Sequence, residues 1–399
     1  MINRIKKYDW KNFNILLVGI AVVLCCISAF TLRMASGPSM MKSQLIGMLM
    51  GLVIIAVLSV LDYHFICQFS AVYYLFGLGL TAATHTPLGT AGSTDSVRWI
   101  QLGPVTFQPS ELMKIIFIIT LASFYVQMEK NLDRWSTLLI AAVLTVIPML
   151  LIMSQPDLSS SLVILFIMVI MVFVAGTSYK IIAPIVAVGL PLSLALFWYI
   201  QQPNNLILRG YQFRRIYAWR HPDLDASKDL NMQQDHSIAA IAEGGLYGKF
   251  IKDGGVHEAS RAYERVPVNE SDFIWSVIGE EFGFLGCCLI LLLLAIIIIQ
   301  CFRIARKSKD FLGMMIATGV GSLFLFQVFS NICVATRMFP NTGLPLPFLS
   351  NGLSSMMSSM IAIGLVLNVG IQPAKSSGGG FTMRTAYSDD TDKDLDLDL

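Results

Sequence analysis

The chain has 399 residues, of which 55% are hydrophobic and only 14% are charged. An ordinary soluble domain, in which about a quarter of the residues are charged, does not fit this composition. The formal net charge of +2 gives no indication of a nucleic-acid partner. Because the charges cluster, long stretches are almost free of them, which is typical of membrane spans.

Apolar segments of spanning length follow one another along the chain. Each approaches the roughly 20 residues that a helix needs to cross the hydrocarbon. Backbone polar groups in lipid must pair within their own segment, so we predict helices. The segments are 13–33, 43–62, 66–84, 110–128, 137–154, 159–176, 180–200, 273–302, 312–335 and 354–372. The expected fold is an all-α polytopic membrane protein with about ten transmembrane helices and a large extracellular loop, about 201–272, between helices 7 and 8.

Lysine and arginine in the short loops predict the orientation. The connection 303–310 holds Arg303, Arg306, Lys307 and Lys309. With this connection inside, both termini are cytoplasmic and the 201–272 segment is extracellular. Residues 1–373 are expected to form a single transmembrane domain. The tail 374–399 is rich in Ser and Gly and then acidic, so we predict a disordered cytoplasmic tail.

Charged and aromatic residues surround the start of the fourth predicted span. Lys114 lies in its first turns and follows Arg98, Trp99 and Glu111. Either the Lys114 ammonium snorkels to the interface, or it forms with Arg98 a cationic pocket for an anionic head group such as a diphosphate. Trp99 is either an interfacial anchor or a platform for a sugar ring.

Carboxylates mark the starts of two later spans. Helix capping accounts for Asp157 before 159–176 and for Asp272 before 273–302. It does not account for Glu280 and Glu281, which lie two turns further along and need partners, for which the basic residues of the long loop are candidates. A carboxylate cluster facing a basic outer cavity would suit proton abstraction or a bound divalent cation.

Two further segments bear on this cavity. In the long loop, Arg214 and Arg215 are either a phosphate clamp or an ordinary interfacial cluster. The apolar segment 340–350 contains three prolines and a glycine, which forbid a regular helix. Irregular backbone at membrane depth is tolerated only where it packs in protein or lines a cavity. We therefore predict a re-entrant loop that roofs the same cavity.

Taken in chain order, these motifs resemble the SEDS family, the shape, elongation, division and sporulation proteins. The matching segments are 98–100, 108–114, 155–157, 271–274 with 279–286, and 343–350. They cover most of the chain and follow the order and spacing of the family. Asp9 and Trp10, which precede the first span, resemble most closely the rod-shape, RodA-like branch.

The resemblance implies a peptidoglycan glycosyltransferase of the bacterial cytoplasmic membrane. It would polymerise lipid II, an undecaprenyl-diphosphate-linked disaccharide peptide, into glycan strands at the outer face, with inversion at the anomeric carbon, in cell-shape maintenance, division or sporulation. The expected partners are lipid II, membrane lipid and a class B penicillin-binding protein transpeptidase. The alternatives are a flippase or transporter for a lipid-linked precursor, which a cavity with intramembrane charge also suits, and a non-catalytic scaffold for the penicillin-binding protein.

Asp272 matches the essential aspartate of the family, so we predict it as the catalytic base. It could instead hold a divalent cation, Mg²⁺ or Mn²⁺; no other cofactor is expected. The predicted substrate-binding residues are Arg98, Trp99, Glu111, Lys114, Asp157, Glu280, Pro345 and Ser350.

The chain departs from the family pattern at positions beside the expected cavity. Val268 stands where the family has Glu, and Glu270 where it has His. His236 replaces a Gln, and Asn351 replaces a Tyr. These departures leave the expected fold unchanged but suggest a divergent substrate or a paralogue of weak activity.

Overall fold

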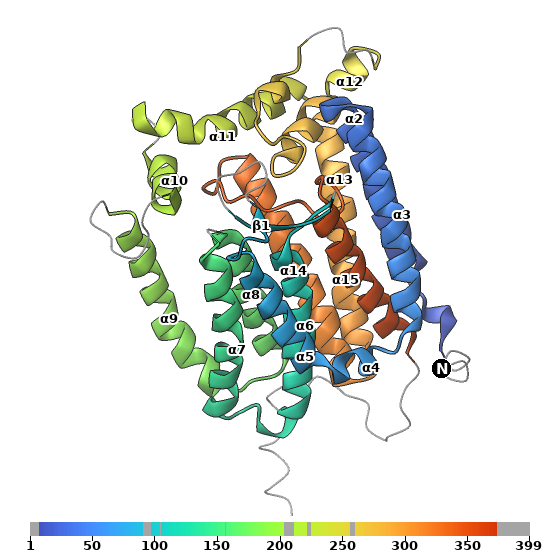
Figure 1. Cartoon of the computed structure of the whole chain (residues 1–399), viewed down its shortest axis with the longest axis vertical. Helices are drawn as coiled ribbons and strands as arrows, with labels where there is room; N and C mark the ends of the chain where they lie inside the picture. The colour runs from blue at the N-terminus through green and yellow to red at the C-terminus, as the bar shows by residue number, and fades with distance from the viewer. Residues whose placement is uncertain are drawn as a thin grey trace, which may run out of the picture.

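The computed structural model describes residues 8–90, 97–103, 105–155, 157–202, 211–221, 225–255 and 260–372. It shows a bundle of long helices with shorter helices lying across one end (Figure 1). The predicted tail 374–399 lies outside the described residues.

Each predicted span corresponds to a helix of the bundle. These helices are α2 (Ile15–Ser36), α3 (Pro38–Val60), α5 (Ser70–Ala83), α6 (Pro109–Gln127), α7 (Trp135–Met153), α8 (Leu158–Val174), α9 (Tyr179–Ile200), α13 (Ile274–Lys307), α14 (Phe311–Ala335) and α15 (Leu353–Ile371). Within the described residues, eight are long and apolar enough to cross a membrane, while α5 and α8 have only 14 and 17 residues. The all-α polytopic class is confirmed, and the count of ten spans stays a prediction.

Short elements connect the spans. The helical ones are η1 (Trp10–Asn12), α4 (Tyr63–Gln68), η2 (Glu129–Asn131), α10 (Tyr211–Arg220), α11 (Asp225–Gly244), α12 (Lys249–Lys252) and η3 (Ala262–Arg265). An antiparallel sheet of β1 (Gly89–Thr90), β2 (Trp99–Leu102) and β3 (Val105–Phe107) precedes α6, with Ile100 opposite Phe107. The segment predicted as one polar loop is therefore largely helical where it is described.

The bundle has two distinct ends. The Asp9 backbone N–H donates to the Ile371 carbonyl at 2.9 Å, which places both ends of the described chain together. We call this the termini end, and the opposite end, which α10, α11, α12 and the sheet cover, the loop end (Figure 1). Between the two ends, α6 and α14 form the centre of the bundle, since 83% of the residues in the most apolar 18-residue stretch of each are buried. In α9, at the periphery, only 6% of the corresponding stretch is buried.

Helix α13 is interrupted at Gly283, whose φ of 65° and ψ of −167° are not helical. A break in a helix leaves N–H groups without their usual partners. The Phe284 and Leu285 N–H groups donate instead to the carbonyls of Gly245 and Leu246, at 2.8 and 3.1 Å. The chain between α11 and α12 is thereby joined to α13 backbone to backbone.

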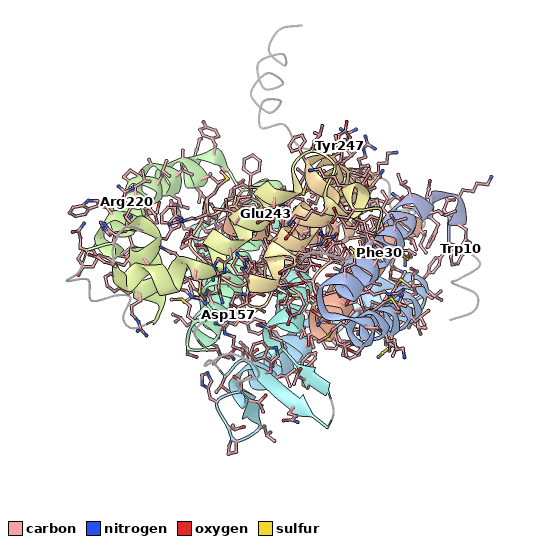
Figure 2. All side chains as sticks on the ribbon, turned by 90° about the horizontal axis from the view of Figure 1, so that it is seen from above. Trp10, Phe30, Asp157, Arg220, Glu243 and Tyr247 are labelled. Carbon is pink, nitrogen blue, oxygen red and sulfur yellow. The ribbon has the colours of Figure 1, made fainter. Side chains whose placement is uncertain are left out.

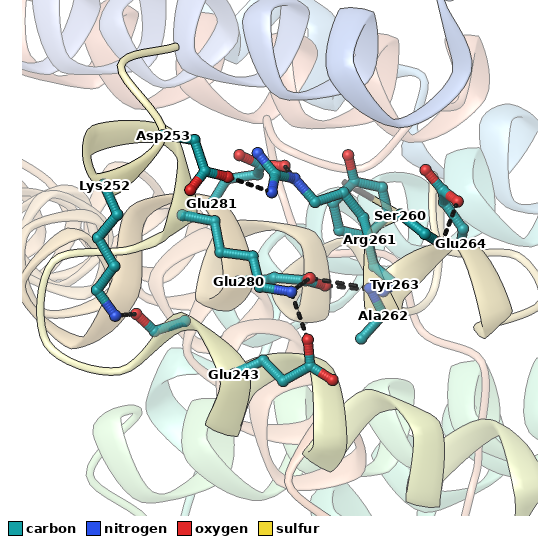
Figure 3. A network of polar contacts seen from close by, with 12 residues as sticks. Glu243, Lys252, Asp253, Ser260, Arg261, Ala262, Tyr263, Glu264, Glu280 and Glu281 are labelled. Atoms are coloured by element: carbon teal, nitrogen blue, oxygen red, sulfur yellow. Dashed lines mark hydrogen bonds and ion pairs between the residues drawn. The ribbon is translucent and has the colours of Figure 1, made fainter. Parts of the chain in front are cut away.

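Buried charged side chains also meet at this junction (Figure 3). Glu280 is fully buried and accepts hydrogen bonds from the Ala262 and Tyr263 N–H groups, at 2.9 and 2.8 Å, and from the Lys249 ammonium. Glu281, equally buried, accepts from Arg261 Nε at 3.0 Å. The expectation that basic residues of the long segment partner these two glutamates is thus confirmed.

Arg261 continues the network outward, because its Nη1 donates to Asp253 at 2.6 Å. Lys249 also contacts Glu243 at the end of α11. We call this set, Glu243, Lys249, Asp253, Arg261, Glu280 and Glu281, the α13 network. It fixes the first part of α13, which begins two residues after Asp272, against the chain that covers the loop end.

We expect Gly244→Ala to loosen this junction. A Cβ at Gly244 would overlap the Gly279 carbonyl oxygen, which belongs to the α13 backbone and cannot swing aside. Overpacking of this kind costs about 1–3 kcal/mol. The melting temperature of the detergent-purified protein should fall clearly below that of Gly19→Ala, a helical glycine whose Cβ would meet nothing within 4 Å. Equal melting temperatures would contradict the close approach.

We expect Arg261→Met to destabilise the protein by more than its loss of charge alone suggests. It leaves the Glu281 carboxylate buried without its cation, and breaking a buried pair in this way costs about 3–5 kcal/mol. Arg265→Met, an exposed arginine of η3, is the matched control. The measurement is thermal unfolding of both variants in the same detergent, and indistinguishable curves would refute the role of Arg261.

Candidate active site

Asp272 lies at the loop end, immediately before α13. Its carboxylate accepts a hydrogen bond from the Ser271 hydroxyl at 2.8 Å. Its backbone carbonyl accepts from the Asn331 amide of α14 at 2.9 Å, and the same amide donates to the Leu344 carbonyl at 2.7 Å. One buried side chain of α14 thus fixes Asp272 and the segment 340–350 relative to each other.

The segment 340–350, which we call the roof loop, borders the Asp272 carboxylate. It is non-helical, as its prolines predict. Gly343 has a φ of 72°, and a Cβ there would lie 2.9 Å from an Asp272 carboxylate oxygen. Glycine is therefore suited to this position both for its backbone conformation and for the space it leaves beside the carboxylate.

Helices from distant parts of the chain hold the roof loop in place. The Ser159 hydroxyl of α8 donates to the Thr342 carbonyl, and Arg215 Nη1 of α10 donates to the Asn341 carbonyl at 3.0 Å. Because Arg215 is attached to this loop, its guanidinium is carried to the same site as Asp272.

The roof loop is also joined to the chain before Asp272. The Ser350 hydroxyl donates to the Ser271 carbonyl and accepts from the Leu346 N–H, both at 2.7 Å. In this structure the Ser350 hydroxyl is thus engaged within the protein. Pro345 lies half-buried in the same loop.

Four charged groups interact at this site: Asp272, Asp157, Arg98 and Arg215. Burial raises the pKa of Asp272 above its usual range, while the Ser271 hydroxyl and the two arginines lower it and Asp157 raises it further. Burial, together with the like charge of Arg98, lowers the pKa of Arg215 to about 10. An anionic ligand between the two guanidiniums would relieve their mutual repulsion.

Asp157 has a structural function as well. It is the N-cap of α8, accepting from the Ser160 N–H at 3.0 Å, and its second oxygen accepts from the Gln108 amide at 3.5 Å. The capping explanation therefore holds, and the same side chain also contributes to the field at Asp272. Trp99 begins β2 opposite Thr90 and is half-buried, next to Arg98.

Glu111 and Lys114 form an ion pair of 2.7 Å within α6. Lys114 is fully buried, which excludes the snorkelling interpretation. The Ser358 hydroxyl of α15 donates to the Glu111 carbonyl at 2.9 Å. Lys114 lies five residues, about 7.5 Å, further along α6 than Pro109, its first residue, at about 1.5 Å per residue. The pair thus lies in the first two turns of α6, and its members are not among the groups that chiefly shift the pKa of Asp272.

The structure does not bring Glu280 to Asp272. Its two oxygens are occupied by two backbone N–H groups and Lys249 in the α13 network. The prediction that Glu280 binds substrate beside Asp272 is therefore wrong for this structure: closeness in sequence does not bring the two carboxylates together. Arg215, by contrast, is brought to the site by its bond to the Asn341 carbonyl of the roof loop, a contact that the sequence does not indicate.

Three of the four departures from the family pattern, Val268, Glu270 and Asn351, lie close to Asp272, whereas the His236 ring contacts the Arg265 carbonyl at 2.8 Å. The Asn351 N–H donates to the Glu270 carbonyl at 2.8 Å, so these two positions adjoin. Val268 has a φ of 59°, which is strained for a β-branched residue, and Phe348 in the roof loop has a φ of 66°. Such strain costs about 1–3 kcal/mol per residue and is concentrated at functional sites.

The donor set does not fit a metal ion held by protein alone. Among the described residues, no group of three or more His, Cys, Asp or Glu side chains gathers as a metal site. The carboxylates of Asp272 and Asp157 share their surroundings with two guanidiniums.

Comparison with known proteins identifies the family. The family model for cell cycle proteins of the FtsW, RodA and SpoVE type matches residues 9–375. The chain is 35% identical over 273 residues to stage V sporulation protein E of Bacillus subtilis, covering 68% of this chain and 70% of that protein. It is 32% identical over 338 residues to a probable peptidoglycan glycosyltransferase FtsW of Trichlorobacter lovleyi, covering 84% of each.

Solved structures agree with this. A chain of a peptidoglycan synthase complex that coordinates polymerization and crosslinking matches with a TM-score of 0.73 and 27% identity, over 91% of this chain and 97% of that one. The rod shape determining protein RodA of Thermus thermophilus matches with a TM-score of 0.63 and 26% identity, over 91% and 96%. Since members of all three branches match, assignment to the rod-shape branch stays a prediction. The chain belongs to the FtsW, RodA and SpoVE family of cell cycle proteins, the SEDS family.

Proposed function

We propose that this protein is a peptidoglycan glycosyltransferase that polymerises lipid II at the outer face of the bacterial cytoplasmic membrane. The observation that carries the proposal is the position of Asp272, a carboxylate of raised pKa held beside Arg98 and Arg215. Relatives named as probable peptidoglycan glycosyltransferases support the reaction class.

In the proposed reaction, a sugar hydroxyl of one lipid-linked disaccharide attacks the anomeric carbon of another. The bond from that carbon to the diphosphate breaks, and the configuration inverts. Asp272 accepts the hydroxyl proton, for which a carboxylate of raised pKa is better suited than an ordinary one. Arg98 and Arg215 stabilise the charge that develops on the departing diphosphate, as guanidiniums bind phosphate oxygens in pairs of hydrogen bonds.

The remaining predicted residues take supporting roles in this proposal. Trp99 offers an aromatic face next to Arg98 for a sugar ring. The buried Lys114 and Glu111 pair sets the polarity beneath the site, and Asp157 both caps α8 and adds to the field at Asp272.

A divalent cation, Mg²⁺ or Mn²⁺, also stays a proposal. Such ions bind through a few carboxylates together with substrate phosphates, so Asp272 would supply part of the oxygen shell and the diphosphate the rest.

We propose that the loop end faces outward and that both termini are cytoplasmic. The basic residues 303–309 between α13 and α14 support this, because short cytoplasmic loops carry an excess of Lys and Arg.

We also propose a class B penicillin-binding protein as partner, supported by the similarity to a chain of a peptidoglycan synthase complex.

We expect Asp272→Asn to reduce polymerisation of lipid II by at least about 10²-fold, since the amide cannot accept the proton. The assay uses protein purified in detergent, where polymerisation is measurable and net transport is not, so activity there also separates an enzyme from a flippase. Glu264→Gln, an exposed side chain of η3, is the matched control and should keep full activity. Undiminished polymerisation by a folded Asp272→Asn protein would refute the assignment of the base.

The pH dependence tests the electrostatics of the site. Activity requires ionised Asp272, so it should fall as the pH drops through the raised pKa of this carboxyl. Arg215→Met removes a positive charge that lowers this pKa, and therefore should move the acidic limb of the profile to higher pH. Arg214→Met, the exposed neighbour, should leave the limb in place. A limb that stays fixed in Arg215→Met, or moves to lower pH, would show that Arg215 does not act on Asp272.

A further inference from the structure

Three large apolar side chains are exposed on the segment that the sequence predicts to be polar. Leu246, Tyr247 and Ile251 are 48%, 53% and 64% exposed. We call them the α12 patch, since they flank and include part of α12. Exposed apolar side chains concentrated on a short stretch indicate a contact with another apolar phase or molecule.

The patch adjoins the membrane-facing surface of α13. The backbone of Gly245 and Leu246 is hydrogen-bonded to Phe284 and Leu285, at 2.8 and 3.1 Å. Phe284 and Leu285 are themselves exposed, as is Leu289 one turn further along α13. The exposed apolar side chains of this span therefore adjoin the α12 patch.

The length of α13 gives the depth of this surface. Residues 285–302 have no charged side chain, and Arg303 follows them. At about 1.5 Å per residue, these 18 residues extend about 27 Å, close to the roughly 30 Å thickness of the hydrocarbon. With Arg303 at one boundary, Leu285 and the bonded Leu246 lie at the other.

The rest of the segment has the composition of an interfacial element. The Lys249 ammonium turns away to Glu280 and Glu243, while Lys252 and Asp253 are exposed. Tyr is enriched at the level of the lipid head groups, and Lys there places its stem along apolar surface with its charge in water.

Aromatic packing holds the patch at this level. Phe250, between Tyr247 and Ile251, packs edge-on against Phe30 of α2 with ring centroids 5.3 Å apart, and lies 6.3 Å from Phe282. Phe250 thus packs against rings of both α2 and α13, while Tyr247 and Ile251 remain exposed. Viewed onto the loop end, Tyr247 lies toward the edge of the molecule and Glu243 nearer its middle (Figure 2).

We propose that the α12 patch is a lipid-binding surface, with Leu246, Tyr247 and Ile251 in contact with acyl chains and head groups of the leaflet on the loop side. The occupant is membrane phospholipid, because the patch continues a surface that already faces lipid. The patch anchors the covering segment to the bilayer, and through the α13 network it fixes the height of Asp272. The consequence for catalysis rests on the proposed function, whereas the lipid contact does not.

Photocrosslinking in lipid nanodiscs tests the contact. A benzophenone amino acid replaces Tyr247 or Ile251 in the full chain, in discs of phosphatidylethanolamine and phosphatidylglycerol, and mass spectrometry counts phospholipid adducts. Leu289 on α13 is the lipid-facing reference, and Glu264 is the exposed reference on η3. We expect yields at Tyr247 and Ile251 comparable to Leu289 and several-fold above Glu264. Yields at the level of Glu264, or adducts to polypeptide without lipid adducts, would overturn the proposal.

A second measurement uses the unsubstituted chain, so that folding of the variants does not decide the outcome. A hydrophobic diazirine dissolved in the bilayer should label residues 246–251 together with 284–289 on irradiation, and leave 262–265 unlabelled. Labelling of 284–289 without 246–251 would overturn the proposal. Polymerisation assayed on the same discs reports separately on the proposed function, so the failure of one is distinguishable from the failure of the other.

Discussion

The interruption of α13 at Gly283 is the constraint on which the arrangement of the loop end depends. A helix that stops and restarts within an apolar surrounding must find partners for its freed N–H groups. Here the carbonyls of Gly245 and Leu246 supply them. They reach the helix because Gly244 and Gly248 bring backbone against backbone, at positions where a Cβ would overlap α13. A long polar segment thereby acquires one fixed position.

The buried charges make that contact specific for one arrangement. An ion pair in a dry environment contributes little net stability, because desolvation offsets the attraction. A buried glutamate without its partner destabilises the fold strongly. Glu280 and Glu281 therefore favour only arrangements that bring Lys249 and Arg261 to them. The α13 network therefore selects one docking of the covering segment among many of similar apolar contact. The positions of the first part of α13, and of Asp272 before it, are thereby fixed as well.

The site at Asp272 combines two requirements that oppose each other. A base needs a carboxylate whose proton affinity is raised, and burial provides this. A diphosphate needs positive charge, which lowers the same proton affinity. Arg98 and Arg215 are close enough to lower the pKa of Asp272, but burial raises it by more. A site arranged in this way can hold an anion and keep a competent base beside it.

The sequence by itself determined the class of fold and the elements that border the site. Hydropathy and the need to pair backbone groups in lipid are local properties, so each predicted span appears as a helix. Three prolines and a glycine close together likewise prevent a regular helix in the roof loop, whatever packs around it. Asp272 and Asp157 can be predicted as site residues because each belongs to a short motif at the start of a helix.

Only the tertiary structure decided which charges meet. Arg215 reaches the site through Asn341, 126 positions away. Glu280 pairs instead with Lys249 and the backbone N–H groups of Ala262 and Tyr263, although it is closer to Asp272 in sequence than Arg215 is. The sequence also gave no sign that α12 lies level with the start of the apolar part of α13. Pairing of this kind depends on where a kink such as Gly283 directs the chain, and a helix break changes the position of everything that follows it, which no local pattern of residues records.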